Sequence, residues 1–305
     1  MPARLRASPA RPPLRRAIPL VLLLTLVWGT TWPLFPMAVR EVSVWTFRAA
    51  SLLGAGLLLL AIARLRGESL RIPRAHWGTV LAASWVYLVV WNVASTYAAI
   101  LIPSGQAAIL GFTMPLWAAL VAWALLGQAP GVRVLLALVA GGLGVGLLIF
   151  DGLGVYAKAP LGFALGLLSG FGWALGTVLL KSRPVPVSSL VLTGWQLLVA
   201  AAPVVVTALL LGEGAWFMPS TTTIAVIAYI TLVPMAIGNV TWFAIVGLLP
   251  ANIAGLSSVM VPVVAMISGA IVLDEPLGPI QWAAMVCCAA GLALALLKAA
   301  APAAK

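Results

Sequence analysis

The sequence has very little charge. Only 8% of its 305 residues are Asp, Glu, Lys or Arg, and only six of them are acidic. A soluble domain of this length has about 25% charged residues. With 63% hydrophobic residues and a mean hydropathy of +1.16, the chain has too little polar surface to cover itself in water. These shortages exclude an ordinary soluble domain and favour an integral membrane protein.

Residues suited to metal binding and catalysis are also scarce. His76 is the only histidine, and the two cysteines, Cys287 and Cys288, are adjacent, which is a poor geometry for an ordinary disulfide. The sequence has no cluster of His, Cys and carboxylate residues with metal-ligand spacing and no credible nucleophile–base pair. We therefore expect no catalytic residue, no metal site and no cofactor, and we expect a protein that is not an enzyme.

Long apolar runs dominate the rest of the chain. They lack the period-two alternation of outer-membrane strands, so they predict helices rather than a barrel. A membrane-spanning helix needs roughly 20 apolar residues. The sequence therefore predicts an all-α integral membrane protein with ten transmembrane helices, at about 17–38, 44–63, 76–98, 103–126, 132–150, 160–180, 188–211, 222–244, 250–272 and 279–297.

The positive charges predict the orientation. With the amino terminus in the cytoplasm, fourteen of the seventeen Lys and Arg residues fall on the cytoplasmic side, and the other three are Arg40, Arg48 and Lys158. Ten spans return the carboxyl terminus to the cytoplasm, so we expect cytoplasmic tails at 1–16, which is basic, and at 298–305. We expect the inner (plasma) membrane as the location. The basic residues behind the net charge of +11 are then expected to orient the chain in the membrane and to contact anionic lipid, rather than to bind nucleic acid.

An internal repeat divides the chain into two halves of five spans. Residues 92–150 align without a gap with residues 239–297, at an offset of 147. The informative matches are Asn92 with Asn239, Pro103 with Pro250, Pro115 with Pro262, and Gly144 with Gly291. Because each half has an odd number of spans, the second half must insert upside down relative to the first. Inverted halves of this kind favour transport by alternating access.

Prolines fall inside several predicted spans. Proline removes a backbone donor and crowds the preceding turn, so it kinks a helix. Pro33, Pro115, Pro234 and Pro262 are therefore candidate gating hinges. The alternative is that proline is simply more frequent in membrane helices than in soluble ones.

Three short motifs resemble the EamA-type drug/metabolite transporter superfamily. They are Trp28-Gly29-Thr30-Thr31, Phe47-Arg48 and Leu273-Asp274-Glu275-Pro276-Leu277. The resemblance spans two EamA repeats, at 17–150 and 160–297. It implies ten helices, cytoplasmic termini and export of small metabolites, with aromatic and neutral amino-acid exporters as the closest group. The first repeat departs from the family at Gly127-Gln128-Ala129, where an acidic residue is common, while the second repeat keeps Glu275.

Neutral polar and aromatic residues are the candidates for substrate binding. Asn92 and Asn239 lie in mid-span, and each offers a donor and an acceptor without a buried net charge. Their alternative role is to hold helices together. Deeper aromatic residues can form a wall against an apolar or aromatic group, or can simply pack in the core. The aromatic candidates are Trp28, Tyr87, Trp91, Trp173 and Trp242.

Charged residues are almost absent from the middle of the spans. No acidic residue lies there, which argues against a proton-coupled exporter of organic cations. Arg48 lies within a span, about one turn from its outer end. We expect its side chain to extend to the membrane surface or to pack against a helix, with binding of a substrate carboxylate as the alternative.

These observations favour a facilitator that exports a small neutral or zwitterionic metabolite, most simply an amino acid, by uniport and alternating access. The expected partners are this small-molecule substrate and membrane lipid, and the chain is a monomer or a homodimer. One alternative is an exporter of drugs or nucleotide-type metabolites, although a nucleotide sugar requires more cations than Arg48 alone. A receptor or assembly protein is a second alternative, and it predicts no substrate flux.

Overall fold

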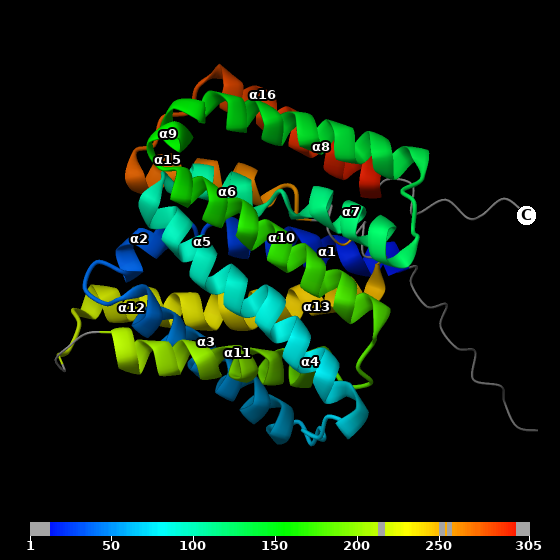
Figure 1. Cartoon of the computed structure of the whole chain (residues 1–305), viewed down its shortest axis with the longest axis vertical. Helices are drawn as coiled ribbons and strands as arrows, with labels where there is room; N and C mark the ends of the chain where they lie inside the picture. Colours follow the sequence, from blue (N-terminus) through cyan, green and yellow to red (C-terminus); the bar gives the residue numbers. More distant parts are fainter. Residues whose placement is uncertain (1–12, 213–216, 250–253, 255–257, 297–305) are drawn as a thin grey trace, which may run out of the picture.

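The computed structural model describes residues 13–212, 217–249, 254 and 258–296 (Figure 1). Within these ranges every regular element is a helix and none is a strand. The elements before residue 152 are α1 (Pro13–Gly29), α2 (Leu34–Ala38), α3 (Val44–Leu65), η1 (Arg74–His76), α4 (Trp77–Ala83), η2 (Ser84–Val89), α5 (Val90–Leu101), α6 (Ser104–Gly111), α7 (Met114–Leu126) and α8 (Val132–Asp151). The later ones are α9 (Leu153–Lys158), α10 (Pro160–Ser182), α11 (Ser189–Leu211), α12 (Thr221–Ile230), η3 (Thr231–Gly238), α13 (Asn239–Leu248), α15 (Val261–Leu273) and α16 (Pro279–Leu296).

Seven helical segments among the described residues are long and apolar enough to cross a membrane. They are Val44–Leu65, Arg74–Leu101, Ser104–Leu126, Val134–Asp151, Pro160–Ser182, Ser189–Leu211 and Thr221–Leu248. Three shorter apolar helices, Arg16–Gly29, Val261–Leu273 and Pro279–Gly291, lie in the remaining three predicted ranges. The chain is therefore a multi-pass membrane protein.

Parts of the sequence prediction lie outside the described residues. Pro250, which the repeat matches with Pro103, is one of them, as are the start of the range 250–272, the tail 298–305 and most of the tail 1–16. The helix α1 already begins at Pro13, inside that first tail.

The predicted hinge prolines lie where the helices are interrupted or irregular. Pro33 precedes α2, after a turn that ends α1 at Gly29, and Pro115 is the second residue of α7, after a break that follows α6. Pro262 is likewise the second residue of α15. The first turn of a helix tolerates proline because its N–H groups have no partner inside the helix. Pro234 lies inside η3. Movement at these four positions stays a prediction.

Two π-helical segments interrupt the helices at equivalent positions of the repeat. Ser84, which begins η2, and Thr231, which begins η3, are separated by the same 147 residues as the matched asparagines. Pro234 provides a local cause for η3, but η2 contains no proline and has Tyr87 at that position. The proline pattern therefore could not predict η2. Such segments in membrane helices are frequent at functional sites.

Glycines allow the outer helix pairs of the bundle to approach closely. In Figure 1, α8 and α16 run together along the upper edge, and α3 and α11 pack against each other toward the opposite edge. A methyl group on Gly144 of α8 would lie 2.8 Å from the Ala284 carbonyl of α16. One on Gly291 of α16 would lie 2.9 Å from the Gly141 nitrogen of α8. Gly144 and Gly291 are matched by the repeat, so the two halves contact each other reciprocally.

The helices α1 and α10 show the same exchange of partners. α1 packs against η3, α13 and α15, whereas α10 packs against η2, α5 and α7. The offset of 147 relates η2, α5 and α7 to η3, α13 and α15, and it relates both ends of α7 to both ends of α15. Thus α1 of the first half packs on elements of the second half, and α10 of the second half packs on the matching elements of the first half.

Carboxylates at the helix ends join the two halves. Glu41 accepts hydrogen bonds from the backbone nitrogen and the hydroxyl of Ser220, both at 2.6 Å. Three similar contacts are Asp151 with Gln281 (2.6 Å), Glu275 with Ser104 (2.9 Å) and Glu68 with Ser188. The two donors on Ser220 hold the pKa of the exposed Glu41 carboxyl below its ordinary value. These acids therefore tie the ends of the bundle together.

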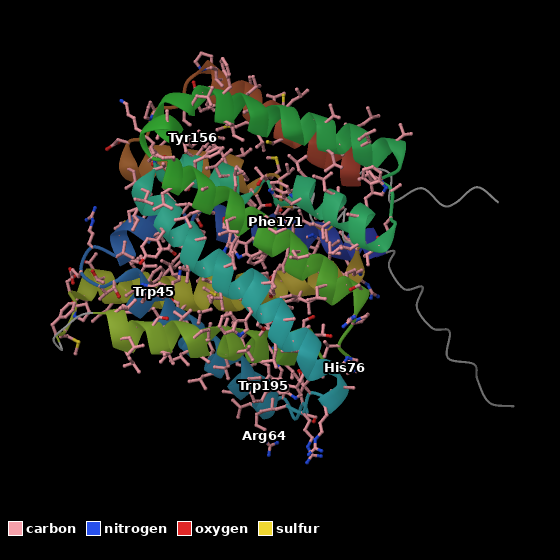
Figure 2. All side chains as sticks on the ribbon, in the orientation of Figure 1. Trp45, Arg64, His76, Tyr156, Phe171 and Trp195 are labelled. Carbon is pink, nitrogen blue, oxygen red and sulfur yellow. The ribbon has the colours of Figure 1, made fainter. Side chains whose placement is uncertain are left out.

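Tryptophans lie toward both ends of the bundle. Figure 2 shows Arg64, His76 and Trp195 near one another and Trp45 on the other side of the bundle. The Trp195 indole donates to the Leu70 carbonyl at 2.7 Å and contacts Trp77 edge-on. A tryptophan anchored in this way at a helix end is typical of a residue at the membrane–water interface.

The glycine contact between α8 and α16 gives the first prediction. Gly144→Ala should lower the melting temperature of the detergent-purified protein, because backbone atoms must shift to admit the methyl group, at a cost of about 1–3 kcal/mol. Gly146→Ala is the matched control in the same helix, since nothing lies within 4 Å of its added methyl group. Equal melting temperatures for the two variants would contradict the close packing of α8 on α16.

Candidate functional site

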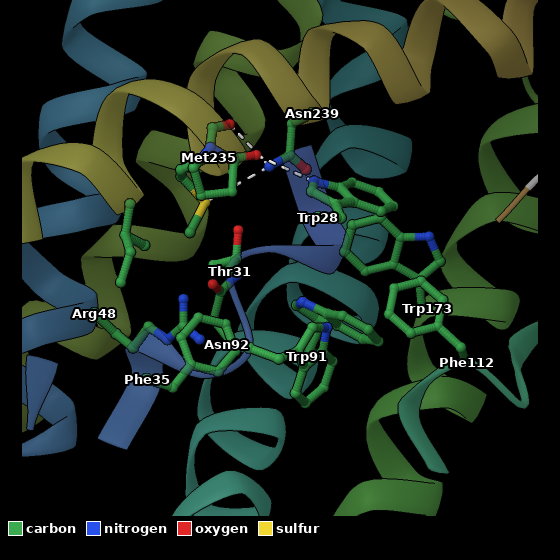
Figure 3. A pocket seen from close by; sticks show the side chains of 13 residues that line it. Trp28, Thr31, Phe35, Arg48, Trp91, Asn92, Phe112, Trp173, Met235 and Asn239 are labelled. Atoms are coloured by element: carbon green, nitrogen blue, oxygen red, sulfur yellow. Dashed lines mark hydrogen bonds between the residues drawn. The ribbon is translucent and has the colours of Figure 1, made fainter. Parts of the chain in front are cut away.

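A central cavity lies where the interrupted helices of both halves meet (Figure 3). The space between its walls that is wide enough to admit water molecules is only about 40 Å³. The lining residues are Trp28, Thr31, Trp32, Phe35, Arg48, Trp91, Asn92, Phe112, Trp173, Ile230, Pro234, Met235 and Asn239. Small-molecule sites usually have about 300–1,000 Å³, so the cavity is closed down in this structure. A ligand must therefore widen a narrow, largely aromatic space.

Arg48 is the charged residue of this cavity. Its side chain is 1% exposed, and its Nε donates a hydrogen bond of 2.6 Å to the Thr96 hydroxyl. The guanidinium carbon also lies 4.4 Å from the ring centre of Phe35 and 4.6 Å from that of Phe47. Its Nη2 is buried without a hydrogen-bond partner among the described residues. The cavity therefore contains a positive charge with donor capacity to spare.

The sequence-based preference for Arg48 was wrong in one respect. A side chain that extends to the membrane surface would be exposed, and Arg48 is buried in the bundle. It does make a helix-packing contact with Thr96, which was part of that preference, and it also faces the cavity. Its position near the end of a span could not reveal which way the side chain turns. The only sequence signal was the Phe47-Arg48 motif itself.

Asn92 and Asn239 place equivalent groups in the cavity. Each is buried, and each donates from Nδ2 to the carbonyl four residues earlier, Leu88 at 2.7 Å and Met235 at 2.8 Å. The Oδ1 atom of both is buried without a partner. Because an unpaired buried carbonyl costs about 1–3 kcal/mol, two such atoms beside one cavity mark places where a ligand donor would stabilise the protein. Asn92 lies three residues after the end of η2, and Asn239 directly follows η3.

Tryptophan and phenylalanine rings form the other side of the cavity. Trp173 contacts Trp91 edge-on at 4.7 Å between ring centres and Trp28 at 5.1 Å, and Phe112 packs against Trp91 at 5.7 Å. In Figure 3 Trp173 and Phe112 lie on the right, Arg48 lies on the left, and Asn239 lies above Trp28. One end of a ligand thus meets charge and amide oxygens, and the other end meets aromatic faces.

Trp28 has a fixed place in this wall. Its indole nitrogen donates to the Pro234 carbonyl at 3.2 Å, a bond that crosses from α1 to η3 and is dashed in Figure 3. Gly238 makes this approach possible, because a methyl group there would lie 2.3 Å from the indole nitrogen. The irregular segment η3 therefore holds a ring of the other half in position.

The predicted substrate-binding residues fall into two groups in the structure. Trp28, Trp91, Asn92, Trp173 and Asn239 line the cavity together. Their role in binding stays a prediction.

The remaining two candidates lie behind the wall rather than on it. Tyr87 contacts Trp173 at 4.9 Å, and Trp242 contacts Trp173 and Trp28, each at 5.7 Å. Trp32, Phe35, Phe112 and Met235 line the cavity although they were not among the predicted residues. A single apolar or aromatic residue in an apolar span gives no signal of which face it occupies.

The described carboxylates lie elsewhere. Glu275 and Asp151 line a second cavity of about 260 Å³ at one end of the bundle, together with Gln106 and Gln281. The sequence placed Glu275 only in a loop and did not predict its contact with Ser104 of the first half. In the part of the chain that the structure describes, no acidic side chain lines the central cavity to neutralise Arg48.

Comparison with known proteins identifies relatives that match most of the chain. The profile of the EamA-like transporter family matches residues 15–150 and again residues 160–297. The uncharacterized transporter YvbV of Bacillus subtilis is 25% identical over 87% of this chain and 86% of its own length. The uncharacterized inner membrane transporter YedA of Escherichia coli K12 is 26% identical over 86% of this chain and 84% of its own.

One further relative matches about half of the chain, and one solved structure has a similar fold. A probable amino-acid metabolite efflux pump of Escherichia coli K12 is 34% identical over 49% of this chain and 52% of its own length. A crystal structure of a protein 20% identical to this chain has a TM-score of 0.74, with 94% of this chain and 99% of that one covered. The second similarity shows a shared fold.

The contact between Gly238 and Trp28 gives the second prediction. Gly238→Ala should displace the indole, break its bond to Pro234 and destabilise the protein by about 1–3 kcal/mol. The indole ¹⁵N–¹H resonance of Trp28, identified from a Trp28→Phe sample, should shift or disappear. Gly247→Ala is the control, because its methyl group meets open space. An unchanged Trp28 resonance in Gly238→Ala would show that the contact is wrong.

Proposed function

We propose that this chain, which belongs to the EamA-like transporter family, exports a small neutral or zwitterionic metabolite and that an α-amino acid fits its cavity best. The family match and the apolar helices make it a multi-pass membrane transporter. The substrate is the part that we propose.

One observation carries the proposal. The unpartnered Nη2 of Arg48 and the unpartnered Oδ1 atoms of Asn92 and Asn239 belong to the lining of one cavity. A carboxylate would satisfy the first, and an ammonium group would satisfy one or both amide oxygens. A zwitterion therefore supplies the two kinds of group that the cavity lacks, because its carboxylate would pair with Arg48 and its ammonium group with the amide oxygens.

The aromatic wall accommodates the remainder of such a molecule. Trp28, Trp91, Trp173 and Phe112 offer ring faces and edges to an apolar or aromatic side chain. The half-length similarity to a probable amino-acid metabolite efflux pump agrees with this class of substrate. Lipid around the bundle and this small molecule are the partners we propose, for a monomer or a homodimer.

Two inverted five-helix halves would move the substrate by alternating access. The reciprocal contacts of Gly144 and Gly291, and the exchange of partners by α1 and α10, support such halves within ten helices. We propose that these halves correspond to 17–150 and 160–297. The prolines at the helix breaks would serve as hinges. The excess of basic residues in alternate loops supports cytoplasmic termini in an inner (plasma) membrane.

The proposed mechanism is uniport down the substrate gradient. Proton-coupled exporters of cations commonly use a carboxylate inside the membrane. Among the described residues, the acids near the helix ends bond Ser220, Gln281, Ser104 and Ser188 instead of lining the central cavity.

A nucleotide-type substrate fits less well. Its two phosphates would need several cations, and Arg48 is the one cationic residue in the described lining of the cavity. An apolar drug would leave Arg48 and both asparagine oxygens without partners. A receptor or assembly role gives no reason for the unpartnered groups to face a common space.

The third prediction is substrate flux. Proteoliposomes with the purified protein should exchange labelled L-phenylalanine, L-tryptophan, L-leucine, L-threonine or glycine in a counterflow assay. The rate should be the same with and without a pH gradient, because no acidic residue of the described cavity couples flux to protons. Absence of flux for the whole panel would reject the amino-acid proposal. A rate that follows the gradient would reject uniport while leaving the substrate class intact.

The fourth prediction concerns the amide oxygens. Asn92→Ala and Asn239→Ala should each raise the half-saturating concentration of the transported amino acid about tenfold, since a hydrogen bond to a charged group is lost. Ser169→Ala is the control, because Ser169 is buried and bonds only its own helix at the Gly166 carbonyl in the described contacts. Unchanged half-saturation in both asparagine variants, at equal protein levels, would exclude a binding role for the pair.

A further inference from the structure

Arg48 is held on three sides by protein groups. Its Nε donates to Thr96, and the rings of Phe35 and Phe47 lie near the guanidinium carbon. A guanidinium can bind a carboxylate in two planar modes, either through Nε and one Nη or through its two Nη groups. Because Thr96 occupies Nε, the first mode is blocked. The edge that remains is the one with the unpartnered Nη2.

Thr96 is a fixed acceptor for this purpose. Its hydroxyl donates its single proton to the Asn92 carbonyl at 2.7 Å, one turn earlier in α5, so toward Arg48 the oxygen can only accept. The residue is fully buried, and a β-branched side chain has few rotamers in a helix. The hydroxyl therefore cannot turn away from Arg48 without losing its own bond.

The same turn of α5 presents a second group to the cavity. The Asn92 carbonyl anchors Thr96, and the Asn92 side chain lines the cavity with its unpartnered Oδ1. The guanidinium edge and this amide oxygen are thus set relative to each other by one helical turn. A carboxylate and an ammonium group at a fixed separation would match such a pair.

We propose that Thr96, which is not itself in the cavity lining, is the positioning residue that sets the specificity of the site for carboxylate-bearing substrates. By occupying Nε, it turns the Nη edge of Arg48 toward the cavity and limits binding to a planar, end-on carboxylate. The inference rests on the proposed function, because it assumes that the substrate carboxylate binds Arg48.

The test is the discrimination between an acid and its amide. Flux of the best-transported member of the amino-acid panel is measured in proteoliposomes, with competition by the unlabelled amino acid and by its carboxamide. In the native protein the amino acid should compete strongly and the carboxamide weakly. In Thr96→Val the ratio of the two inhibition constants should fall about tenfold, with a raised KM and a nearly unchanged maximal rate, because the guanidinium loses its orientation.

Matched variants separate positioning from a general loss of structure. Thr96→Ser keeps the hydroxyl and should restore the native ratio. Thr193→Val removes another buried threonine hydroxyl, one that donates to the Ser189 carbonyl of its own helix, and it should leave the ratio unchanged. If Thr96→Val does not yield folded protein, Thr96→Ala is measured in its place, because a smaller side chain needs no extra space.

Each outcome decides between the two proposals. Native flux with an unchanged ratio in the Thr96 variant, or a loss that Thr96→Ser fails to restore, overturns the positioning role and leaves the amino-acid proposal standing. No flux of any amino acid by the native protein overturns the proposed function, and the role of Thr96 with it. A reduced ratio in Thr193→Val also overturns the positioning role, because the effect is then not specific to Thr96.

Discussion

The guanidinium of Arg48 is buried in a membrane-embedded bundle, and no carboxylate of the described structure lines the cavity that it faces. An arginine keeps its charge even when it is buried, and a buried charge costs several kcal/mol unless other groups stabilise it. Thr96 and two phenylalanine rings supply part of that stabilisation. The Nη2 of Arg48 keeps no hydrogen-bond partner among the described residues, and Arg48 lines the cavity. The other lining residues surround this charge and the space in which a ligand carboxylate would pair with it.

The repeat duplicates most of the site but not its charge. Trp28 and Trp173 occupy related positions 145 residues apart and contact each other, and the N-cap serines that precede α3 and α11, Ser43 and Ser188, have the same separation. That spacing places Thr193 in α11 where α3 has Arg48. The cavity therefore has two equivalent asparagine oxygens but a single arginine, and this asymmetry would give the proposed zwitterionic ligand a preferred orientation.

The all-helical, multi-pass fold could be predicted from the sequence, because the apolar character of a span is additive over many residues. The matched asparagines were candidates because asparagine is uncommon in spans and its repetition is informative, and the tryptophans were candidates because they lie deep in the predicted spans. The direction of Arg48 was not predictable, since it depends on Thr96 and Phe35, which come from other segments. The segment η2 was also missed, because it contains no proline to indicate it. The contact of Glu275 with Ser104 depends on how the halves pack, which no local pattern encodes.

The most direct test of this account is the ligand-induced change in melting temperature of the purified protein and of its Arg48→Gln variant. The best-transported amino acid and its carboxamide would each be added at saturating concentration. If the buried charge is neutralised by the substrate carboxylate, the amino acid should raise the melting temperature of the native protein, and its carboxamide should not. In Arg48→Gln this difference should vanish. Equal stabilisation of the native protein by both ligands, or a difference that persists in Arg48→Gln, would contradict the account.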